Sequence, residues 1–391
     1  MSVLYVAMKY DYGKPEQGYS FEHYNFYHSL LHMGHDIIYF DFKTLMQERG
    51  KDWMNRKLSE IVMAEKPDLM FTVLFTDELD QAVIRNISEN TDTITLNWFC
   101  DDHWRFDNFS SYWAPCFNWV ITTAISALPK YEEIGYKNVI NSQWACNHFL
   151  YRKMDLPLKY DVTFVGQPHG NRREIIQAMR NKGIDVWAWG SGWDSGRITQ
   201  DEMIRVFNQS RINLNLSNAS VYIHNAPCMN ASFKLASRSL DLIPFGDGLK
   251  SIGKRCISMV NSKKSNTTND FGSILYCQNK SDQIKGRNFE VPGCGGFILT
   301  GLADNLELYY RIGKEIICFE NVKDLLNKAC YYLENEDERM MIAQAGYKRT
   351  MREHTYVHRF NEIFQRIGLP YMSADAALRG DIEPGTTIEV N

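Results

Sequence analysis

Residues 160–193 read YDVTFVGQPHGNRREIIQAMRNKGIDVWAWGSGW, and this stretch decides the fold. Its first apolar run, 160–165, predicts a buried strand. A glycine-containing loop follows, then a helical segment over 171–181 that Gly183 closes, then a second apolar run over 185–189. Thr199 is expected to cap the next helix, and 212–216 is a strand again. Strands and helices that alternate in this order are typical of a parallel α/β sheet.

The same alternation occurs earlier in the chain, so residue 160 marks the start of a second series of strands and helices. Apolar runs at 3–8 and 37–40 are separated by a polar loop and by a helix that begins at Ser20 and ends near Gly34. Further runs at 69–74, 93–99, 119–122 and 139–141 extend the pattern. We therefore predict an α/β protein with two Rossmann-like, doubly wound domains that face a cleft. Ligands of such sheets bind beyond the carboxyl ends of the strands.

The predicted N-terminal domain covers 1–156 and the C-terminal domain covers 157–356. Inside the second domain the alternation breaks at about 218–283, which we interpret as an insertion. A helix over 357–371 is expected to follow. Residues 372–391 are polar and are expected to form a disordered tail.

Composition describes a soluble protein without a general attraction for polyanions. The 391 residues are 44% hydrophobic and 23% charged, with a formal net charge of −4. The nine cysteines have no framework spacing, which favours reduced thiols. The N-terminus lacks a signal pattern, and no apolar run reaches the length of a membrane span. These features predict a cytoplasmic protein without membrane insertion.

The stretch from Gln283 to Phe364 resembles the C-terminal domain of the bacterial CgeB-like glycosyltransferases, relatives of the group 1 enzymes. Four segments carry the resemblance: Arg287-Asn288-Phe289-Glu290, Cys294-Gly295-Gly296-Phe297, Gly313-Lys314-Glu315 and His354-Thr355-Tyr356-x-x-Arg359. The resemblance implies the GT-B fold, with an acceptor-side N-terminal domain. It also implies transfer of a sugar from a nucleoside-diphosphate sugar, by family habit a UDP-sugar, with retention of configuration.

The resemblance also places the donor. A glutamate at the position of Glu290 accepts hydrogen bonds from the ribose hydroxyls in similar enzymes, and we expect its side chain to line the cleft. Lys285 and Arg287 are candidates to neutralise the diphosphate. Group 1 enzymes usually carry another glutamate seven positions earlier, where this chain has Gln283. The pocket around the transferred sugar is therefore expected to be organised differently.

Further donor-binding candidates lie at predicted strand ends and turns of the second domain: Gly166, Asn171, Arg172, Gly190, Trp193, Asn215 and Asn305. Arg172 follows the first turn of that domain, where a helix start attracts phosphate. An ordinary role as a helix-surface charge stays open for Arg172. Trp193 is either a core residue or a stacking surface for the base or sugar.

The first domain supplies the catalytic candidates. Asp101, Asp102 and His103 directly follow the apolar run at 93–99, so we expect them at the cleft. Asp102 or His103 would orient or deprotonate an acceptor hydroxyl, whereas the alternative is a helix cap and a core histidine. Lys9, Asp11 and Gly13 form a candidate acceptor-side loop. A zinc site at Cys100 and His103 lacks a second pair of ligands, so we predict no obligatory metal and no cofactor.

Several functions remain open from the sequence. The loop after the first strand lacks a dinucleotide-binding glycine pattern, and no phosphate-binding loop of the ATPase type is present. A nucleotide-sugar epimerase and a catalytically weak carbohydrate-binding or coat protein share the predicted fold. The segment 250–287 carries eight Lys or Arg against two Asp, which keeps a base-modifying transferase for nucleic acid open. The acceptor is thus a glycan, a small molecule or nucleic acid, and the oligomeric state is open.

Overall fold

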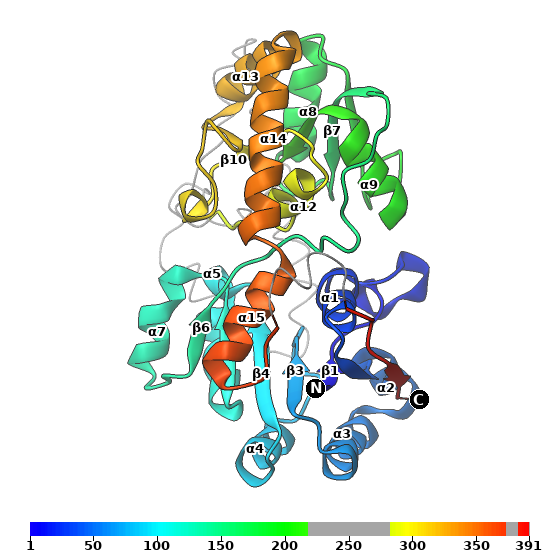
Figure 1. Cartoon of the computed structure of the whole chain (residues 1–391), viewed down its shortest axis with the longest axis vertical. Helices are drawn as coiled ribbons and strands as arrows, with labels where there is room; N and C mark the ends of the chain where they lie inside the picture. Colours follow the sequence, from blue (N-terminus) through cyan, green and yellow to red (C-terminus); the bar gives the residue numbers. More distant parts are fainter. Residues whose placement is uncertain (218–281, 373–381, 391) are drawn as a thin grey trace, which may run out of the picture.

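The computed structural model describes residues 1–217, 282–372 and 382–390, which form two α/β domains (Figure 1). The predicted insertion lies almost entirely outside these residues. Each domain is built on one sheet whose paired strands are all parallel. The first sheet contains the strands up to residue 141 and a strand near the C-terminus, and the second contains the strands between residues 160 and 319. The α/β class and the two doubly wound sheets predicted from the sequence are confirmed.

The N-terminal sheet has the strand order β12-β2-β1-β3-β4-β5-β6. Its strands are β1 (Ser2–Val6), β2 (Asp36–Phe40), β3 (Leu69–Thr72), β4 (Ile94–Phe99), β5 (Trp119–Thr122), β6 (Val139–Asn141) and β12 (Thr387–Glu389). Its helices are α1 (His28–His32), which a π-helical turn (His23–Tyr27) precedes, α2 (Phe42–Arg49), α3 (Lys51–Glu65), α4 (Gln81–Asn90), α5 (Asp102–Arg105), α6 (Ser110–Trp113) and α7 (Leu128–Glu133). The strand order reverses between β1 and β3, which in open α/β sheets marks the ligand crevice.

The C-terminal sheet has the order β11-β10-β9-β7-β8. Its strands are β7 (Tyr160–Val165), β8 (Val186–Trp189), β9 (Ser210–Asn215), β10 (Ile298–Gly301) and β11 (Ile317–Phe319). Its helices are α8 (Arg172–Asn181), α9 (Gln200–Gln209), α12 (Arg287–Gly293), α13 (Val322–Glu334) and α14 (Glu336–Glu353). The predicted cap of α9 is confirmed, because Thr199 and Glu202 form a reciprocal capping box.

The last helix, α15 (Tyr356–Ile367), returns the chain from the second domain to the first (Figure 1). Its aromatic face packs into the core beneath the N-terminal sheet. The ring of Tyr356 lies 5.2 Å from that of Phe26, and the ring of Phe360 lies 5.7 Å from that of Phe71. Burial of each such side chain contributes about 1.5–3 kcal/mol. The helix therefore anchors the end of the second domain in the core of the first.

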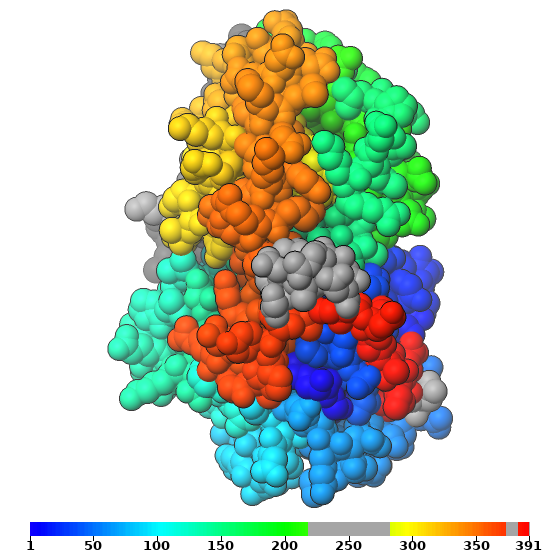
Figure 2. All heavy atoms as spheres, in the orientation of Figure 1, coloured from blue at the N-terminus to red at the C-terminus, as the bar shows by residue number. Residues whose placement is uncertain are grey.

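Part of the predicted disordered tail is ordered. Strand β12 pairs in parallel with β2, and the Ile37 amide donates to the Thr386 carbonyl at 2.8 Å. The close approach requires a glycine, because a Cβ on Gly385 would lie 2.0 Å from the His35 carbonyl oxygen. The sequence does not indicate this strand, because the segment is mostly polar and its central residue, Ile388, is 64% exposed. Figure 2 shows the red tail segment against the blue start of the chain.

None of the helices in the described ranges is long and apolar enough to cross a bilayer. Six cysteines belong to those ranges, and all six are free thiols.

Candidate functional site

A pocket of about 490 Å³ lies between the two domains and is called the interdomain pocket below. The N-terminal domain lines it with the loop after β1 and the following helical turn, including Asp11, Tyr19 and Phe21. The C-terminal domain lines it with Gly166 after β7 and Gly190 after β8. Residues from both domains therefore meet at the carboxyl ends of parallel strands, where ligands of such sheets bind.

An ion pair closes one side of this pocket. The Asp11 carboxylate lies 2.7 Å from the guanidinium of Arg197, so the first loop of one domain contacts the other domain directly. The other two candidates from that loop lie elsewhere. Lys9 pairs with Glu389 of β12 at 2.7 Å, and Gly13 has a φ of 69° and packs on Lys43. Of the predicted acceptor-side loop, the structure brings only Asp11 to the interdomain pocket.

The donor motif forms the buried end of the pocket. Arg287 at the start of α12 lines the pocket, whereas Glu290 one turn later is fully buried beneath it. One carboxylate oxygen of Glu290 accepts a hydrogen bond from the Tyr151 hydroxyl at 2.7 Å, and the other pairs with the Arg287 guanidinium. The expectation that Glu290 lines the cleft is therefore wrong for this structure. The reason is local: α12 has only seven residues, and all of them after Arg287 are buried, so only its first residue reaches the pocket.

Tyr151 was missed by the sequence analysis. It lies in the connection between the two sheets, without a regular element to suggest its role. Burial and the neighbouring Glu290 carboxylate raise the pKa of Tyr151 well above its usual value, so it stays a hydrogen-bond donor. A polar partner for Glu290 from 139 residues away leaves no spacing signal in the sequence.

Lys285 and Gln283 precede α12 and interact with each other. The Lys285 ammonium donates to the Gln283 side-chain oxygen at 2.8 Å. Burial lowers the pKa of Lys285, and the nearby Asp101 carboxylate partly opposes this effect. Lys285 thus lies between the domains, close to the catalytic candidates of the first domain.

Of the remaining donor candidates, some line or support the interdomain pocket and the others lie outside its lining. Gly166 and Gly190 line the pocket, and a Cβ on Gly190 would lie 2.4 Å from the Gly166 carbonyl oxygen. The indole of Trp193 donates to that same carbonyl at 2.7 Å and supports the turn. Asn171 immediately precedes α8. Asn305 adopts the left-handed conformation, with a φ of 62°, before a short 3-10 turn.

Arg172 and Asn215 are buried and bind protein groups. The Arg172 guanidinium donates to the carbonyls of Gln167 and Leu216 at 2.8 and 2.5 Å. The Asn215 amide donates to Asn288 and Thr300, each at 3.0 Å. Both side chains join strand ends of the second sheet to the loops around them. The structure assigns them this supporting role, and they lie outside the lining of the interdomain pocket.

Asp102, predicted as catalytic, is a buried anchor. Its two oxygens accept hydrogen bonds from Ser110 at 2.5 Å and from the Tyr131 hydroxyl at 2.7 Å. Burial raises its pKa, while these hydrogen bonds oppose the rise. Burial and the charge of Lys285 lower the pKa of His103 to about 4, so its imidazole is neutral at pH 7. Of the three catalytic candidates, Asp101 lines a pocket.

Asp101 belongs to a smaller pocket of about 140 Å³, called the N-terminal pocket below. It lies beyond the carboxyl ends of β1, β3 and β4 and contains a second carboxyl group, Glu22. Sequence reasoning missed Glu22, because its position next to Phe21 in an amphipathic segment suggests only a solvated helix face. Burial, followed by repulsion from Asp11 and Asp101, raises the pKa of Glu22 to about 7.

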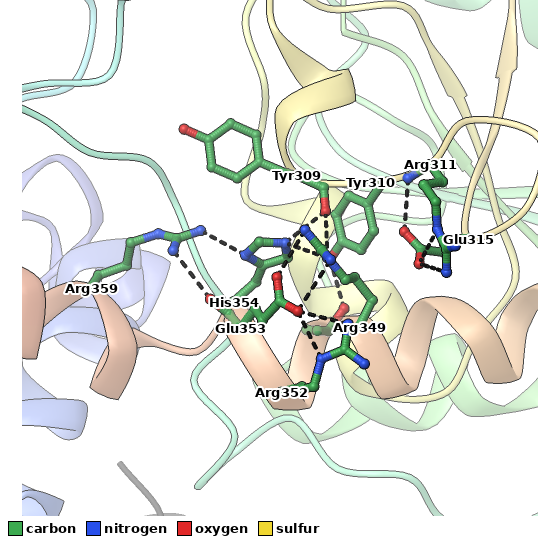
Figure 3. Close-up of polar contacts among 10 residues, drawn as sticks. Tyr309, Tyr310, Arg311, Glu315, Arg349, Arg352, Glu353, His354 and Arg359 are labelled. Atoms are coloured by element: carbon green, nitrogen blue, oxygen red, sulfur yellow. Dashed lines mark hydrogen bonds and ion pairs between the residues drawn. The ribbon is translucent and has the colours of Figure 1, made fainter. Parts of the chain in front are cut away.

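The last segment of the sequence motif has a structural role, which Figure 3 shows. His354 at the end of α14 contacts the Tyr309 carbonyl at 2.7 Å, and Arg359 of α15 lies 3.2 Å from its other ring nitrogen. The Arg359 guanidinium also donates to the Gln143 carbonyl of the interdomain connection at 3.2 Å. Glu315 binds the guanidinium of Arg311 at 2.8 Å beside this junction. These contacts fix the passage of the chain between the domains.

Comparisons with known proteins agree with this arrangement. Residues 171–242 and 254–365 match the family described as "Glycosyl transferase-like". The spore protein CgeB of Bacillus subtilis is 21% identical over 239 residues, which is 61% of this chain and 64% of that protein. The chain thus spans somewhat less than two thirds of that curated relative.

Solved structures with a similar fold cover nearly the whole chain. A sucrose-phosphate synthase from Thermosynechococcus elongatus has a TM-score of 0.58 at 7% identity, over 94% of this chain and 99% of that one. Anabaena HepE in complex with UDP-glucose has a TM-score of 0.53 at 10% identity, over 94% and 99%. AviGT4, a glycosyltransferase of avilamycin A biosynthesis, has a TM-score of 0.51 at 10% identity, over 97% and 98%. Together with the geometry above, these likenesses show the GT-B fold, and the family match and the relative show that part of the chain is similar to the CgeB-like glycosyltransferases.

Proposed function

We propose that this protein transfers a sugar from a UDP-sugar, bound in the interdomain pocket, to an acceptor held by the N-terminal domain. The observation that carries the proposal is the α12 constellation, in which Arg287 and the buried Glu290 end a pocket formed by both domains. The complex of Anabaena HepE with UDP-glucose supports the choice of donor, because that protein has the same fold. Retention of configuration is part of the proposal and rests on the resemblance to group 1 enzymes.

In the proposed complex the diphosphate lies near Arg287, whose side chain is 27% exposed at the pocket. A guanidinium is suited to pair with phosphate oxygens through two parallel hydrogen bonds. As the bond between the sugar and the diphosphate breaks, negative charge grows on the departing oxygen. A fixed cation at that place stabilises the transition state more than the ground state.

Glu290 has to be uncovered before it can bind a ribose. Its carboxylate is satisfied by Tyr151 and Arg287 in this structure, so a ribose hydroxyl reaches it only when one of these donors moves. Arg287 is the better candidate to move, because Tyr151 is 1% exposed while Arg287 lies at the pocket surface. Donor binding would then turn Arg287 from the carboxylate towards the diphosphate.

Metal-independent catalysis is also part of the proposal. Across 1–217, 282–372 and 382–390, no group of three or more His, Cys, Asp or Glu side chains is arranged to hold a metal ion. Arg287 offers positive charge at the interdomain pocket without a metal. The acceptor is proposed to be a glycan or a small molecule, and the cytoplasmic location predicted from the sequence stays a prediction.

Calorimetric titration of UDP into matched variants tests the donor site. Glu290→Gln keeps the shape of the side chain and removes its charge. It should weaken UDP binding by more than tenfold, or about 1.4 kcal/mol. Tyr151→Phe removes the donor to the carboxylate oxygen that the ribose does not use and should leave UDP affinity unchanged. Unchanged affinity in a folded Glu290→Gln variant, judged by its thermal unfolding, would reject the ribose assignment.

A further inference from the structure

Strand β12 is held on the edge of the N-terminal sheet by polar contacts more than by apolar burial. Its three residues, Thr387–Glu389, pair with residues 37–39 of β2. Just before the strand, the Thr386 hydroxyl donates to the Asp36 carboxylate at 2.7 Å. Ile388 at its centre is 64% exposed, so its side chain gains little of the stabilisation that full apolar burial gives. The strand therefore depends on its hydrogen bonds and on the partners of its polar side chains.

Glu389 at the end of β12 binds Lys9, which lies in the segment after β1. The Lys9 ammonium donates to both carboxylate oxygens of Glu389, each at 2.7 Å. The Lys9 side chain is 16% exposed, whereas that of Glu389 is 52% exposed. Burial alone would lower the pKa of Lys9, but the hydrogen bond and the charge of Glu389 outweigh this effect and raise the pKa above its usual value. Glu389 thus compensates the charge of a largely buried ammonium group.

Lys9 is the first residue of a closed loop over residues 9–20, called the 9–20 loop below. The Ser20 amide donates to the Lys9 carbonyl at 2.9 Å, which closes the loop at its base. The Asp11 amide donates to the Gly18 carbonyl at 2.9 Å, so the two sides of the loop stay together beyond the base. Asp11 and Gly18 both line the interdomain pocket. The position of Lys9 therefore sets where the N-terminal wall of this pocket begins.

A second set of contacts connects β12 with the same loop through aromatic rings. The Thr387 hydroxyl lies 3.0 Å from the hydroxyl of Tyr27, on the π-helical turn that follows the loop. The Tyr27 ring lies 4.8 Å from that of His23, and the His23 ring stacks on Tyr19 at 4.2 Å. Burial, followed by the charge of Lys9, lowers the pKa of His23 to about 3, so this ring is neutral at pH 7. Tyr19 lines the interdomain pocket, so this set of contacts also ends at its wall.

The far end of the loop contacts the C-terminal domain. The Arg197 guanidinium donates to the Asp11 carboxylate at 2.7 Å and to the side-chain oxygen of Gln17 at 3.5 Å. In the donor complex proposed above, Glu290 and Arg287 of the C-terminal domain hold the ribose and the diphosphate. The sugar of the donor then faces the opposite wall of the pocket, which the loop provides.

We propose that β12 positions the N-terminal wall of the interdomain pocket, because Glu389 holds Lys9 and thereby fixes the 9–20 loop. This inference rests on the function proposed above. Glu389 lies outside the lining of the pocket, so it is a positioning residue. When Lys9 loses its carboxylate, the loop samples other positions, and the donor meets a complete wall in only a fraction of the molecules. The apparent affinity for the UDP-sugar falls by that fraction, while the geometry of the bound complex is unchanged.

The test combines steady-state kinetics of a UDP-sugar that the wild-type protein consumes with calorimetric titration of UDP, using the full chain. Glu389→Gln keeps the shape of the side chain and removes its charge. The KM for the UDP-sugar should rise about three- to fivefold, the upper range for a partly exposed ion pair. The turnover number and the affinity for UDP should change by less than about twofold. Lys9→Met should give the same rise in KM. The double variant should show no larger rise than either single variant, because the two side chains act as one pair.

Glu383→Gln is the matched control, because Glu383 is an exposed glutamate just before β12, and its variant should keep the wild-type KM. Amide hydrogen exchange at Ile37 reports whether β12 is still paired, and Ile37 should stay protected in Glu389→Gln and Lys9→Met. If Glu389→Gln loosens the strand, Lys9→Met carries the test. An unchanged KM in folded Lys9→Met with Ile37 protected, or additive effects in the double variant, overturns the inference. A wild-type protein that neither binds UDP nor consumes any UDP-sugar refutes the proposed function instead.

Discussion

At the scale of single residues, Asp102 is a buried anchor and Glu22 lines a pocket, whereas the sequence suggests a functional role for Asp102 and none for Glu22. Asp102 follows a buried strand and so resembles a ligand-binding carboxylate, yet Ser110 and Tyr131 use both of its oxygens. Glu22 has no such position in the sequence, yet it lines a pocket. The direction of a side chain after a strand depends on how the next helix packs, which spacing alone does not determine.

Replacing Asp102 tests its structural role. In Asp102→Asn one oxygen becomes an amide donor, so either Ser110 or Tyr131 loses its acceptor in a buried site. The free energy of unfolding should fall by about 1–3 kcal/mol, measured as a lower urea midpoint with an unchanged slope. UDP affinity should stay unchanged, because Asp102 lines neither pocket. A variant of normal stability that loses turnover would instead return Asp102 to the catalytic machinery.

At the scale of elements, the sequence predicts the strands and helices that follow a repeating apolar pattern, and it misses the short elements. The buried strands of both sheets are continuous apolar runs, and the capping box at Thr199 marks the start of α9 directly. By contrast, α12 and β12 have seven and three residues, too few for periodicity to indicate a buried face. For this reason the burial of Glu290 and the pairing of the tail could not be predicted.

Strand β12 offers a sharp test at this scale. Gly385→Ala would place a Cβ against the His35 carbonyl oxygen, so β12 should detach from β2. The Ile37 amide, which donates to Thr386, should then exchange with solvent much faster, as measured by amide hydrogen exchange. Amides of β3 and β4 serve as the internal control, because their partners lie inside the sheet. Unchanged protection of Ile37 would show that the contact tolerates a methyl group.

At the scale of the whole molecule, two of the links between the domains differ in strength. Helix α15 buries an aromatic face in the first domain and is fixed by the His354 and Arg359 junction, so this side acts as the stable connection. The Asp11–Arg197 pair on the pocket side is an accessible ion pair, a type that contributes at most about 1 kcal/mol. The pocket side is therefore held by the weaker of these two links. The resemblance in the sequence indicated the two-domain architecture, while the contacts between the domains required the structure.

The central claim is that a UDP-sugar is the donor and that the protein, without a metal, activates it between the domains. Steady-state UDP release from UDP-glucose, UDP-galactose and UDP-N-acetylglucosamine, measured in the presence of EDTA, tests this claim most directly. The account predicts that at least one donor is consumed and that EDTA leaves the rate unchanged, because protein cations stabilise the departing diphosphate. Activity that EDTA abolishes and Mg²⁺ or Mn²⁺ restores, or no consumption of any UDP-sugar, would contradict it.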